Sequence, residues 1–365
     1  MGDQPGRPID AIKEDWETTK KRYTYWWANE MYDRALVCVT APKPGAQRGV
    51  WPGGPVDLET QWTNVDYMTW RMLENIRTTY YGGEAVPVFS HNWSVGQALI
   101  MGCEPNFAEN TVWTDPLPVG DDGYPPIRFV RDGRWWKWMC ESTLRAAQAS
   151  QGRYFVMPMW GNQAGDNLAL VRGTTTLLMD TVENPTWVKQ AAKKTSDILL
   201  EVYAALWPLV GESISGIEGS INYVSLWSPG KTMGFDCDIS CMISPAAFED
   251  LFLPPLIETM RTVDHRIYHL DGTVALQHLE LLLRVPEIQA IQWVPGAGRD
   301  EVLHWIPLIQ RVQKAGKGIW VSADANDVPA LLGEVSARGL CISTHCASEQ
   351  EARDLVDLVA RLSKA

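Results

Sequence analysis

The residues best suited to chemistry in this sequence stand at the end of an apolar run in its second half. His269 and Asp271 belong to the segment Tyr-His-Leu-Asp-Gly at 268–272, which closes an expected buried strand at 266–270. A second expected strand at 288–294 is followed by Pro-Gly-Ala-Gly, and a helix-like stretch separates the two strands. Because active sites of parallel α/β folds lie at the carboxyl ends of the strands, this imidazole and carboxylate stand where catalysis or metal binding is expected.

Two cysteines stand just ahead of expected helices in the same part of the chain. Cys346 follows an expected strand at 339–344 and precedes a capping box, Ser-Glu-Gln-Glu at 348–351. The positive end of a helix dipole lowers the pKa of a nearby thiol, so we expect the Cys346 pKa to be lowered. Cys241 likewise precedes a helix start, at Ser-Pro 244–245.

Two thiolates and an imidazole that converge at the mouth of a barrel would form a zinc site with one open coordination position. The candidate metal ligands are His269, Cys241 and Cys346, with Asp271 as a further ligand or as an orienting carboxylate. Zinc in such a site stabilises a bound thiolate at neutral pH. Because the candidates are far apart in sequence, a structural interpretation stays open. In it the cysteines are small buried hydrophobes and Asp271 caps a turn.

A metal-free interpretation of the same region uses Asp271, His269 and Glu218 as catalytic residues. Glu218 ends an expected strand at 215–218, which would direct its carboxylate into the same mouth. Paired carboxylates can act as general acid and general base. The alternative is again structural, since acidic residues at loop starts are often turn or cap residues.

Tryptophan is unusually abundant, with 18 residues, several of them adjacent or nearly adjacent in the chain. Successive residues cannot all face inward from one helix or strand, so we expect some indoles to line a cavity or an interface. An aromatic pocket would suit a cationic or aromatic ligand, whereas caps of a barrel mouth or a dimer contact are the alternative. The expected substrate-binding tryptophans are Trp51, Trp62, Trp93, Trp160 and Trp293.

Strands and helices alternate along the chain, which favours parallel β/α units. No Gly-rich nucleotide-binding motif follows the first expected strand, and no P-loop motif occurs. We therefore expect one α/β domain over 1–365, a (β/α)8 TIM barrel with an N-terminal helical extension at 1–34 and a Trp-rich, loop-rich insertion at 90–140. The other expected strands are 35–40, 85–89, 154–159 and 318–322, and the expected helices are 8–34, 66–80, 167–178, 185–209, 246–263, 275–284 and 349–362.

The composition limits the partners and the compartment. A net charge of −12 argues against nucleic acid or an anionic membrane as the main partner. The first residues are polar, and no apolar run approaches the roughly 18 residues that cross a bilayer. Seven scattered cysteines without a secretion signal are typical of reduced thiols, so we expect a cytoplasmic protein.

Several motifs together resemble the uroporphyrinogen decarboxylase superfamily. They are Tyr-His-Leu-Asp-Gly at 268–272, Gln-His-Leu at 277–279, Ile-Gln-Trp-Val-Pro-Gly-Ala-Gly at 291–298, Cys-Met-Ile-Ser-Pro at 241–245 and Trp-Trp-Ala-Asn-Glu-Met-Tyr-Asp-Arg at 26–34. The chain is most similar to the branch labelled trimethylamine corrinoid protein-like. This resemblance implies a single (β/α)8 barrel. The superfamily contains decarboxylases and zinc-dependent methyltransferases that move methyl groups between a corrinoid and a thiol.

The methyltransferases of the superfamily bind zinc through a His-x-Cys-Gly segment and a later Cys. His269 matches that His and Cys346 matches the later Cys, while Asp271 stands where the relatives carry the first Cys. A carboxylate in place of a thiolate makes the site harder and less thiophilic. True uroporphyrinogen decarboxylase is disfavoured, because it resembles an enzyme whose arginine-bearing N-terminal motif holds a polyanionic substrate. No such Arg-rich segment occurs here, where the first expected strand runs into Thr-Ala-Pro-Lys-Pro-Gly at 40–45.

The resemblance thus implies a corrinoid-linked methyltransferase that acts on a small methylated amine or a methoxy-aromatic compound. Zinc would be its metal, a separate corrinoid protein its partner and a homodimer its assembly. Two other classes stay open: a metal-free decarboxylase-like lyase or hydrolase on the same barrel, and a non-catalytic ligand-binding barrel.

Overall fold

The main sheet of the protein has seven strands and is almost entirely parallel. The structure is a computed structural model that describes residues 8–158, 163–298 and 301–364. Each strand runs parallel to its neighbours except β2, which is antiparallel to β1. The strand order across the sheet is β2 (Thr79–Gly83), β1 (Leu36–Pro42), β13 (Leu340–His345), β12 (Gly318–Ser322), β11 (Ala290–Val294), β10 (His265–Asp271) and β9 (Thr232–Phe235).

Three two-stranded sheets complete the strands of the described residues. β3 (Val88–Phe89) pairs in parallel with β6 (Phe155–Val156). β6 lies beside β7 (Ser220–Ile221), and β7 lies beside β9 at the edge of the main sheet. These strands are only two residues long, too short for a continuous hydrogen-bonded ladder. The mostly parallel main sheet and its surrounding helices make this an α/β fold. The described strands do not form one continuous sheet, so closure of the expected eight-stranded barrel is not shown. The other pairs are β4 (Pro105–Phe107) with β5 (Val112–Thr114), and β7 with β8 (Trp227–Ser228).

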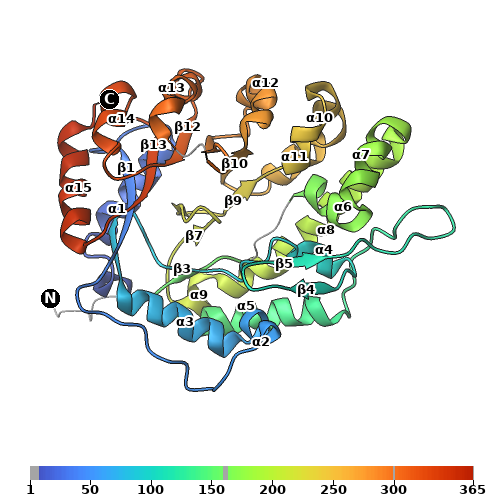
Figure 1. Cartoon of the computed structure of the whole chain (residues 1–365), viewed down its shortest axis with the longest axis horizontal. Helices are drawn as coiled ribbons and strands as arrows, with labels where there is room; N and C mark the ends of the chain where they lie inside the picture. Colours follow the sequence, from blue (N-terminus) through green and yellow to red (C-terminus); the bar gives the residue numbers. More distant parts are fainter. Residues whose placement is uncertain (1–7, 159–162, 299–300, 365) are drawn as a thin grey trace.

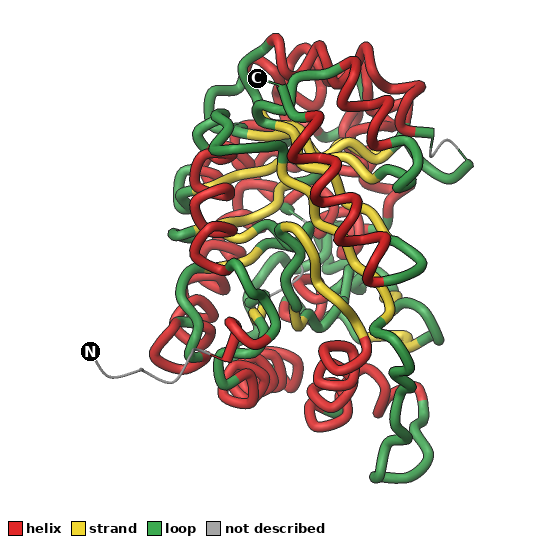
Figure 2. Tube along the Cα trace, turned by 90° about the vertical axis from the view of Figure 1, so that its left-hand side faces the viewer, coloured by secondary structure: helices red, strands yellow, loops and turns green. Residues whose placement is uncertain are grey.

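Helices surround the strands on the outside, as Figures 1 and 2 show. The C-terminal helices follow one another in an arc around the main sheet (Figure 1). The helices are η1 Pro8–Ala11, α1 Trp16–Trp27, α2 Leu58–Thr63, α3 Val65–Thr78, α4 Gly96–Ile100, α5 Arg134–Ser150, α6 Ala164–Arg172, α7 Thr174–Glu183, α8 Pro185–Val210, α9 Glu212–Ser215, η2 Asp238–Met242, α10 Pro245–Leu251, α11 Leu253–Met260, η3 Thr273–His278, α12 Leu279–Arg284, η4 Val302–Trp305, α13 Ile306–Lys314, α14 Val328–Glu334 and α15 Glu349–Leu362.

Both faces of the main sheet are buried, which explains its continuous apolar runs. One face, represented by Ile267, Ala290 and Cys341, belongs to a cluster that contains the aromatic side chains of α1. The opposite face, represented by Tyr268 and Ile291, belongs to the larger cluster formed with the outer helices. Alternation along each strand thus separates an inner layer from an outer one. The inner layer is the one that leads to the functional site.

Most elements expected from the sequence are confirmed, and several have the expected bounds. The expected strand at 318–322 is β12, and the expected helix at 349–362 is α15. Ser348 accepts a hydrogen bond from the Glu351 N–H at 3.2 Å, so the predicted cap of α15 is confirmed. The region 90–140 contains more structure than expected, namely α4, the β4–β5 hairpin and the start of α5.

Four expected elements need correction. The helix expected at 246–263 is divided into α10 and α11 and ends at Met260. The helix expected at 167–178 is divided into α6 and α7, because Gly173 has a φ of 88°, which interrupts the helix. The helix expected at 8–34 ends at Trp27, ahead of Asn29 with a φ of 54°. The strand expected at 215–218 is wrong. Ser215 ends α9, and two glycines with positive φ turn the chain before β7 begins at Ser220.

One helical stretch, Pro185–Ser215, is long and apolar enough to span a membrane by length and composition, and 33% of its most apolar window is buried. Within it, α8 packs one face against α5, α6, α7 and α11. That face carries Val188, Ala192, Thr195 and Leu199, which are three or four residues apart and buried. The helix thus has the amphipathic pattern of a core element.

Candidate metal and substrate site

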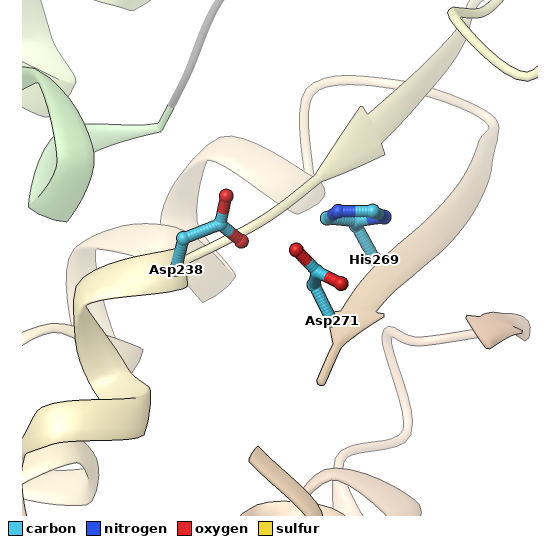
Figure 3. A group of neighbouring side chains, drawn as sticks. All are labelled: Asp238, His269 and Asp271. Carbon is cyan, nitrogen blue, oxygen red and sulfur yellow. The ribbon is translucent and has the colours of Figure 1, made fainter. Parts of the chain in front are cut away.

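Three side chains that can bind a metal ion converge at the carboxyl ends of two neighbouring strands. His269 and Asp271 lie two residues apart on β10, so strand alternation directs both to the same face. Asp238 begins η2, three residues beyond the end of β9. Ligand atoms of the three side chains lie within 4.8 Å of one another. Figure 3 shows the two carboxylates and the imidazole around a common space.

The pairing of β9 with β10 brings Asp238 to the site. Phe235, the last residue of β9, is in register with Tyr268, and both strands run in the same direction. Asp238 was not a candidate from the sequence, because β9 was not identified there. The signal that could have found it is Asp-Cys-Asp at 236–238, two carboxylates in alternation directly after a short apolar strand.

The orientation of His269 is fixed by the neighbouring strand. The Oε1 atom of Gln292 on β11 lies 2.8 Å from Nδ1 of His269, and it also accepts a hydrogen bond from the Tyr223 hydroxyl at 2.6 Å. An amide oxygen can only accept, so Nδ1 donates the proton of this hydrogen bond. The Nε2 lone pair is left for a metal ion or a substrate proton. An acceptor behind the ring is the usual support of a metal-binding histidine.

Two further carboxyl groups, those of Asp166 and Asp236, lie near Asp238. Asp166 on α6 accepts hydrogen bonds from the backbone N–H groups of Asp238 and Ile239, each at 2.9 Å, which fixes the start of η2. Burial, with the nearby Asp238 carboxylate, raises the pKa of Asp166 to about 7. Burial and the Asp166 and Asp238 carboxylates raise the pKa of Asp236 well above its usual range. Both acids therefore hold their protons more tightly than usual, and a nearby cation would favour their ionised forms.

The pKa of Asp238 itself reflects the same surroundings. Burial raises the pKa of Asp238, the His269 imidazole lowers it, and the Asp271 carboxylate raises it again, with a net upward shift. A divalent cation among these groups would reverse that shift, because it stabilises the ionised carboxylates.

A cavity of about 590 Å³ lies against this group, and Asp236, Asp238 and His269 are part of its wall. None of the described residues that line it is a lysine or an arginine. The wall thus offers carboxylates, hydroxyl groups and aromatic rings but no cationic side chain. Its aromatic and hydroxyl-bearing residues are Thr40, Tyr81, Ser94, Tyr223, Ser225, Trp320, Ser343 and Thr344.

Cys241 lies near the metal-binding group but is not part of it. Among the described residues, the group whose ligand atoms converge within 4.8 Å contains Asp238, His269 and Asp271. Burial raises the pKa of the Cys241 thiol, and the Asp238 and Asp271 carboxylates are among the charges that raise it further. The thiol is thus held in its protonated form by the carboxylates that occupy the converging positions.

Cys346 lies just beyond β13, and its thiol does not have the lowered pKa expected from the helix that follows. Burial raises the pKa of Cys346, and the Glu351 and Asp324 carboxylates add to the effect. The side chain is only 4% exposed. The expectation of a lowered pKa is wrong because Ser348 and Glu351 already cap α15, and the Glu351 charge opposes the helix dipole. Cys346 is likewise outside the converging group.

Glu218 lies before β7, at the amino end of that strand rather than at its carboxyl end. Its carboxylate forms an ion pair with Lys20 of α1, and its backbone oxygen accepts a hydrogen bond from Trp227 Nε1 at 2.9 Å. Glu218 is not among the residues that line the cavity beside His269. The structure therefore does not bring it together with His269 and Asp271.

The expected tryptophans are distributed over several environments. Trp93 is buried and stacks on Trp138 with ring centroids 4.4 Å apart. The Trp62 indole is also buried and donates to the Ala108 oxygen at 2.7 Å. Trp51, in the segment before α2, packs against Trp70 of α3. Trp293 is one of the residues around a second cavity, which shares Thr40, Ser343 and Thr344 with the cavity beside His269.

None of these four indoles lines the cavity beside His269, whereas Trp320, which was not a candidate, does. The fifth expected residue, Trp160, lies outside the described residues.

Among solved structures, a methyltransferase from Methanosarcina mazei is similar in fold to this chain. The TM-score is 0.59 at 13% sequence identity, over 94% of this chain and 98% of the other. At this identity the likeness establishes the fold alone. No protein-family profile matches the chain, and no match is found among curated protein sequences.

Proposed function

We propose that this protein is a methyltransferase in which Asp238, His269 and Asp271 hold a divalent metal ion beside a cavity for a small methylated compound. The observation that carries the proposal is the convergence of these three side chains within 4.8 Å against a cavity of about 590 Å³. The fold of the methyltransferase from Methanosarcina mazei supports the reaction class. On the same ground we infer that the sheets follow the course of a (β/α)8 barrel.

The donor set is suited to zinc with one open coordination position, since catalytic zinc sites commonly use three protein ligands from imidazole and carboxylate groups. Bound there, zinc would supply Lewis-acid polarisation of the substrate atom that carries or receives the methyl group. Carboxylate and imidazole are harder ligands than thiolates. A metal ion held by them is therefore expected to bind an oxygen or nitrogen atom of the substrate in preference to sulfur.

The surrounding residues have positioning roles in this proposal. Gln292 and Tyr223 hold His269 with Nε2 toward the shared space. Asp166 holds the backbone of Asp238 in place. Ligand side chains that are already oriented by hydrogen bonds to neighbouring residues need little reorganisation when the metal binds, and this increases the affinity for the metal.

The wall of the cavity restricts the substrate. Without a lysine or arginine among its described lining residues, it offers no partner for a carboxylate or phosphate group. Neutral or cationic methylated compounds are therefore favoured, and polyanionic porphyrinogens are disfavoured. We propose that the methyl group passes to or from a corrinoid carried by a separate protein.

The metal site is tested by elemental analysis of protein expressed with ample zinc. The wild-type protein should carry about one zinc ion per chain, and His269→Ala and Asp238→Ala should each carry less than about 0.2. Cys346→Ser is the matched control and should keep its zinc. A wild-type protein without zinc, or zinc that survives both alanine substitutions, would contradict the proposed site.

The reaction is tested with reduced cobalamin as methyl acceptor and a methylated amine or a methoxy-aromatic compound as donor. Methylcobalamin formation should depend on zinc and on His269. If the zinc-free protein consumes the donor compound without forming methylcobalamin, and this consumption needs Asp271, the metal-free lyase or hydrolase interpretation is favoured instead.

A further inference from the structure

Cys241 belongs to the same short helix as one of the three metal-binding residues. Asp238 begins η2, and Cys241 is three residues further along this 3-10 helix. A 3-10 helix has three residues per turn, so side chains three residues apart eclipse one another. The Cys241 thiol and the Asp238 carboxylate therefore start from the same side of η2, one turn apart.

The thiol lies near both carboxylates of the metal-binding group. Burial raises the pKa of Cys241, and the charges of Asp238 and Asp271 are among those that raise it further. The Cys241 side chain is only partly buried, and the next residue, Met242, is 52% exposed. The thiol is thus beside the group at a place that solvent reaches.

Hydrogen bonds hold η2 in place at both ends. Asp166 accepts from the first backbone N–H groups of the helix, as described above. At the other end, Gln277 Nε2 donates to the Cys241 oxygen at 3.3 Å, and His278 Nε2 lies 2.8 Å from the Ser240 oxygen. A carbonyl oxygen can only accept, so both side chains of η3 donate. The backbone of Cys241 is therefore fixed, and its thiol can move by rotation about the Cα–Cβ bond.

A single metal ion can contact both side chains of η2. Among the described residues, the group that converges within 4.8 Å contains Asp238, His269 and Asp271, with the Cys241 thiol outside it. The rise of a 3-10 helix is about 2 Å per residue, so the two side chains start about 6 Å apart along the axis. A zinc ion lies about 2.0–2.2 Å from a carboxylate oxygen and about 2.3 Å from a thiolate sulfur, so one ion between the two side chains spans that separation.

The other carboxyl group in the cavity wall is less available to the ion than the thiol is. Asp236 accepts a hydrogen bond from the Gln163 N–H at 2.8 Å and also has a side-chain hydrogen bond with Asp166. A metal ion would have to break these contacts to bind Asp236. The thiol of Cys241 is therefore the better candidate for a fourth protein ligand.

We propose that Cys241 is the fourth ligand of the metal ion in the substrate-free protein, and that the substrate heteroatom takes its place. Coordination deprotonates a thiol, so Cys241 loses a proton to solvent when it binds the ion and takes one back when it leaves. The Asp238 and Asp271 carboxylates already balance the charge of a divalent ion, so the thiolate is held less tightly than it would be beside neutral ligands. This role rests on the proposed function for the metal and the substrate.

The ligand is tested by absorption spectroscopy of the full-length protein loaded with cobalt(II) in place of zinc. A thiolate bound to cobalt(II) gives an intense charge-transfer band in the near ultraviolet, which carboxylate and imidazole ligands do not give. The wild-type protein should show this band when it holds about one cobalt ion per chain. Bound cobalt without the band overturns the proposal.

Two cysteine variants identify the sulfur that gives the band. At saturating cobalt, Cys241→Ser should abolish the band, while Asp238, His269 and Asp271 still hold the ion. Cys346→Ser is the matched control and should keep the band, because that buried thiol also stands ahead of a helix but lies outside the converging group. Circular dichroism checks that both variants are folded. A band that survives Cys241→Ser, or that disappears only in Cys346→Ser, overturns the proposal.

Displacement of the thiolate is tested with imidazole, a neutral nitrogen ligand. Titration of the cobalt-loaded wild-type protein with imidazole should reduce the charge-transfer band as Cys241 leaves the ion. A band that is unchanged by imidazole overturns the displacement. A wild-type protein that binds neither cobalt nor zinc would reject the metal site of the proposed function, whereas bound metal without the band rejects the role of Cys241 alone.

Discussion

Replacement of Gln292 by leucine tests whether the metal site is prepared by the protein before the metal binds. Gln292 is buried, and its Oε1 is the shared acceptor for His269 Nδ1 and the Tyr223 hydroxyl. Leucine has a similar size but no acceptor, so His269 loses the bond that fixes its tautomer and ring orientation. Loss of such a supporting contact costs about 10–100-fold in metal affinity, or about 1.4–2.8 kcal/mol.

The assay is competition for zinc between the protein and a chelator of known affinity at pH 7. His269 and Tyr223 each lose the Gln292 acceptor, and a lost hydrogen bond costs about 0.5–1.5 kcal/mol in stability, so urea unfolding of the zinc-free variant is measured in parallel. Tyr223→Phe is the matched control, because it removes the second donor and keeps the His269–Gln292 bond. We expect it to change zinc affinity by less than about threefold. A folded Gln292→Leu protein with wild-type zinc affinity would refute the reasoning.

Three further results are expected. Burial lowers the pKa of His91 from 6.5 to about 4. Between pH 6.5 and pH 4 the imidazole therefore binds a proton in the unfolded chain but not in the folded one. The free energy of unfolding should fall by at most about 3 kcal/mol as the pH drops from 6.5 to 4. Thermal unfolding of His91→Gln should show a weaker fall, and an unchanged one would contradict the assignment. Gly234→Ala should lower both stability and zinc affinity, as measured by urea unfolding and chelator competition, because an added Cβ would lie 1.6 Å from Cε1 of Tyr223, which donates to Gln292. Cys346→Ser should keep its methyl-transfer rate within about twofold of wild type if the thiol is only a buried core group; loss of zinc together with activity would return Cys346 to the ligand set.

The local part of the site could be predicted from the sequence. His269 and Asp271 share a face of β10 because they are two residues apart on one strand, and a strand fixes that relation without help from the rest of the chain. The same holds for the cap of α15, where Ser348 and Glu351 lie three residues apart.

Predictions that combined local features over longer distances were less successful. The helix dipole was expected to lower the pKa of Cys346, but burial and the Asp324 and Glu351 carboxylates raise it. Asp324 approaches from the end of the neighbouring strand β12, a relation that no local pattern contains. Glu218 was assigned to the end of a strand, but positive φ angles at Gly216 and Gly219 place it before one.

By itself the sequence determined the alternation of strands and helices and the shared face of His269 and Asp271 on β10. Only the tertiary structure decided that Asp238 joins His269 and Asp271, that Gln292 supports the imidazole, and that two cavities adjoin across β1 and β13. The physical reason is that these relations depend on which strands become neighbours. That choice is made by burial of the whole sheet between its inner and outer layers, and not by any single segment.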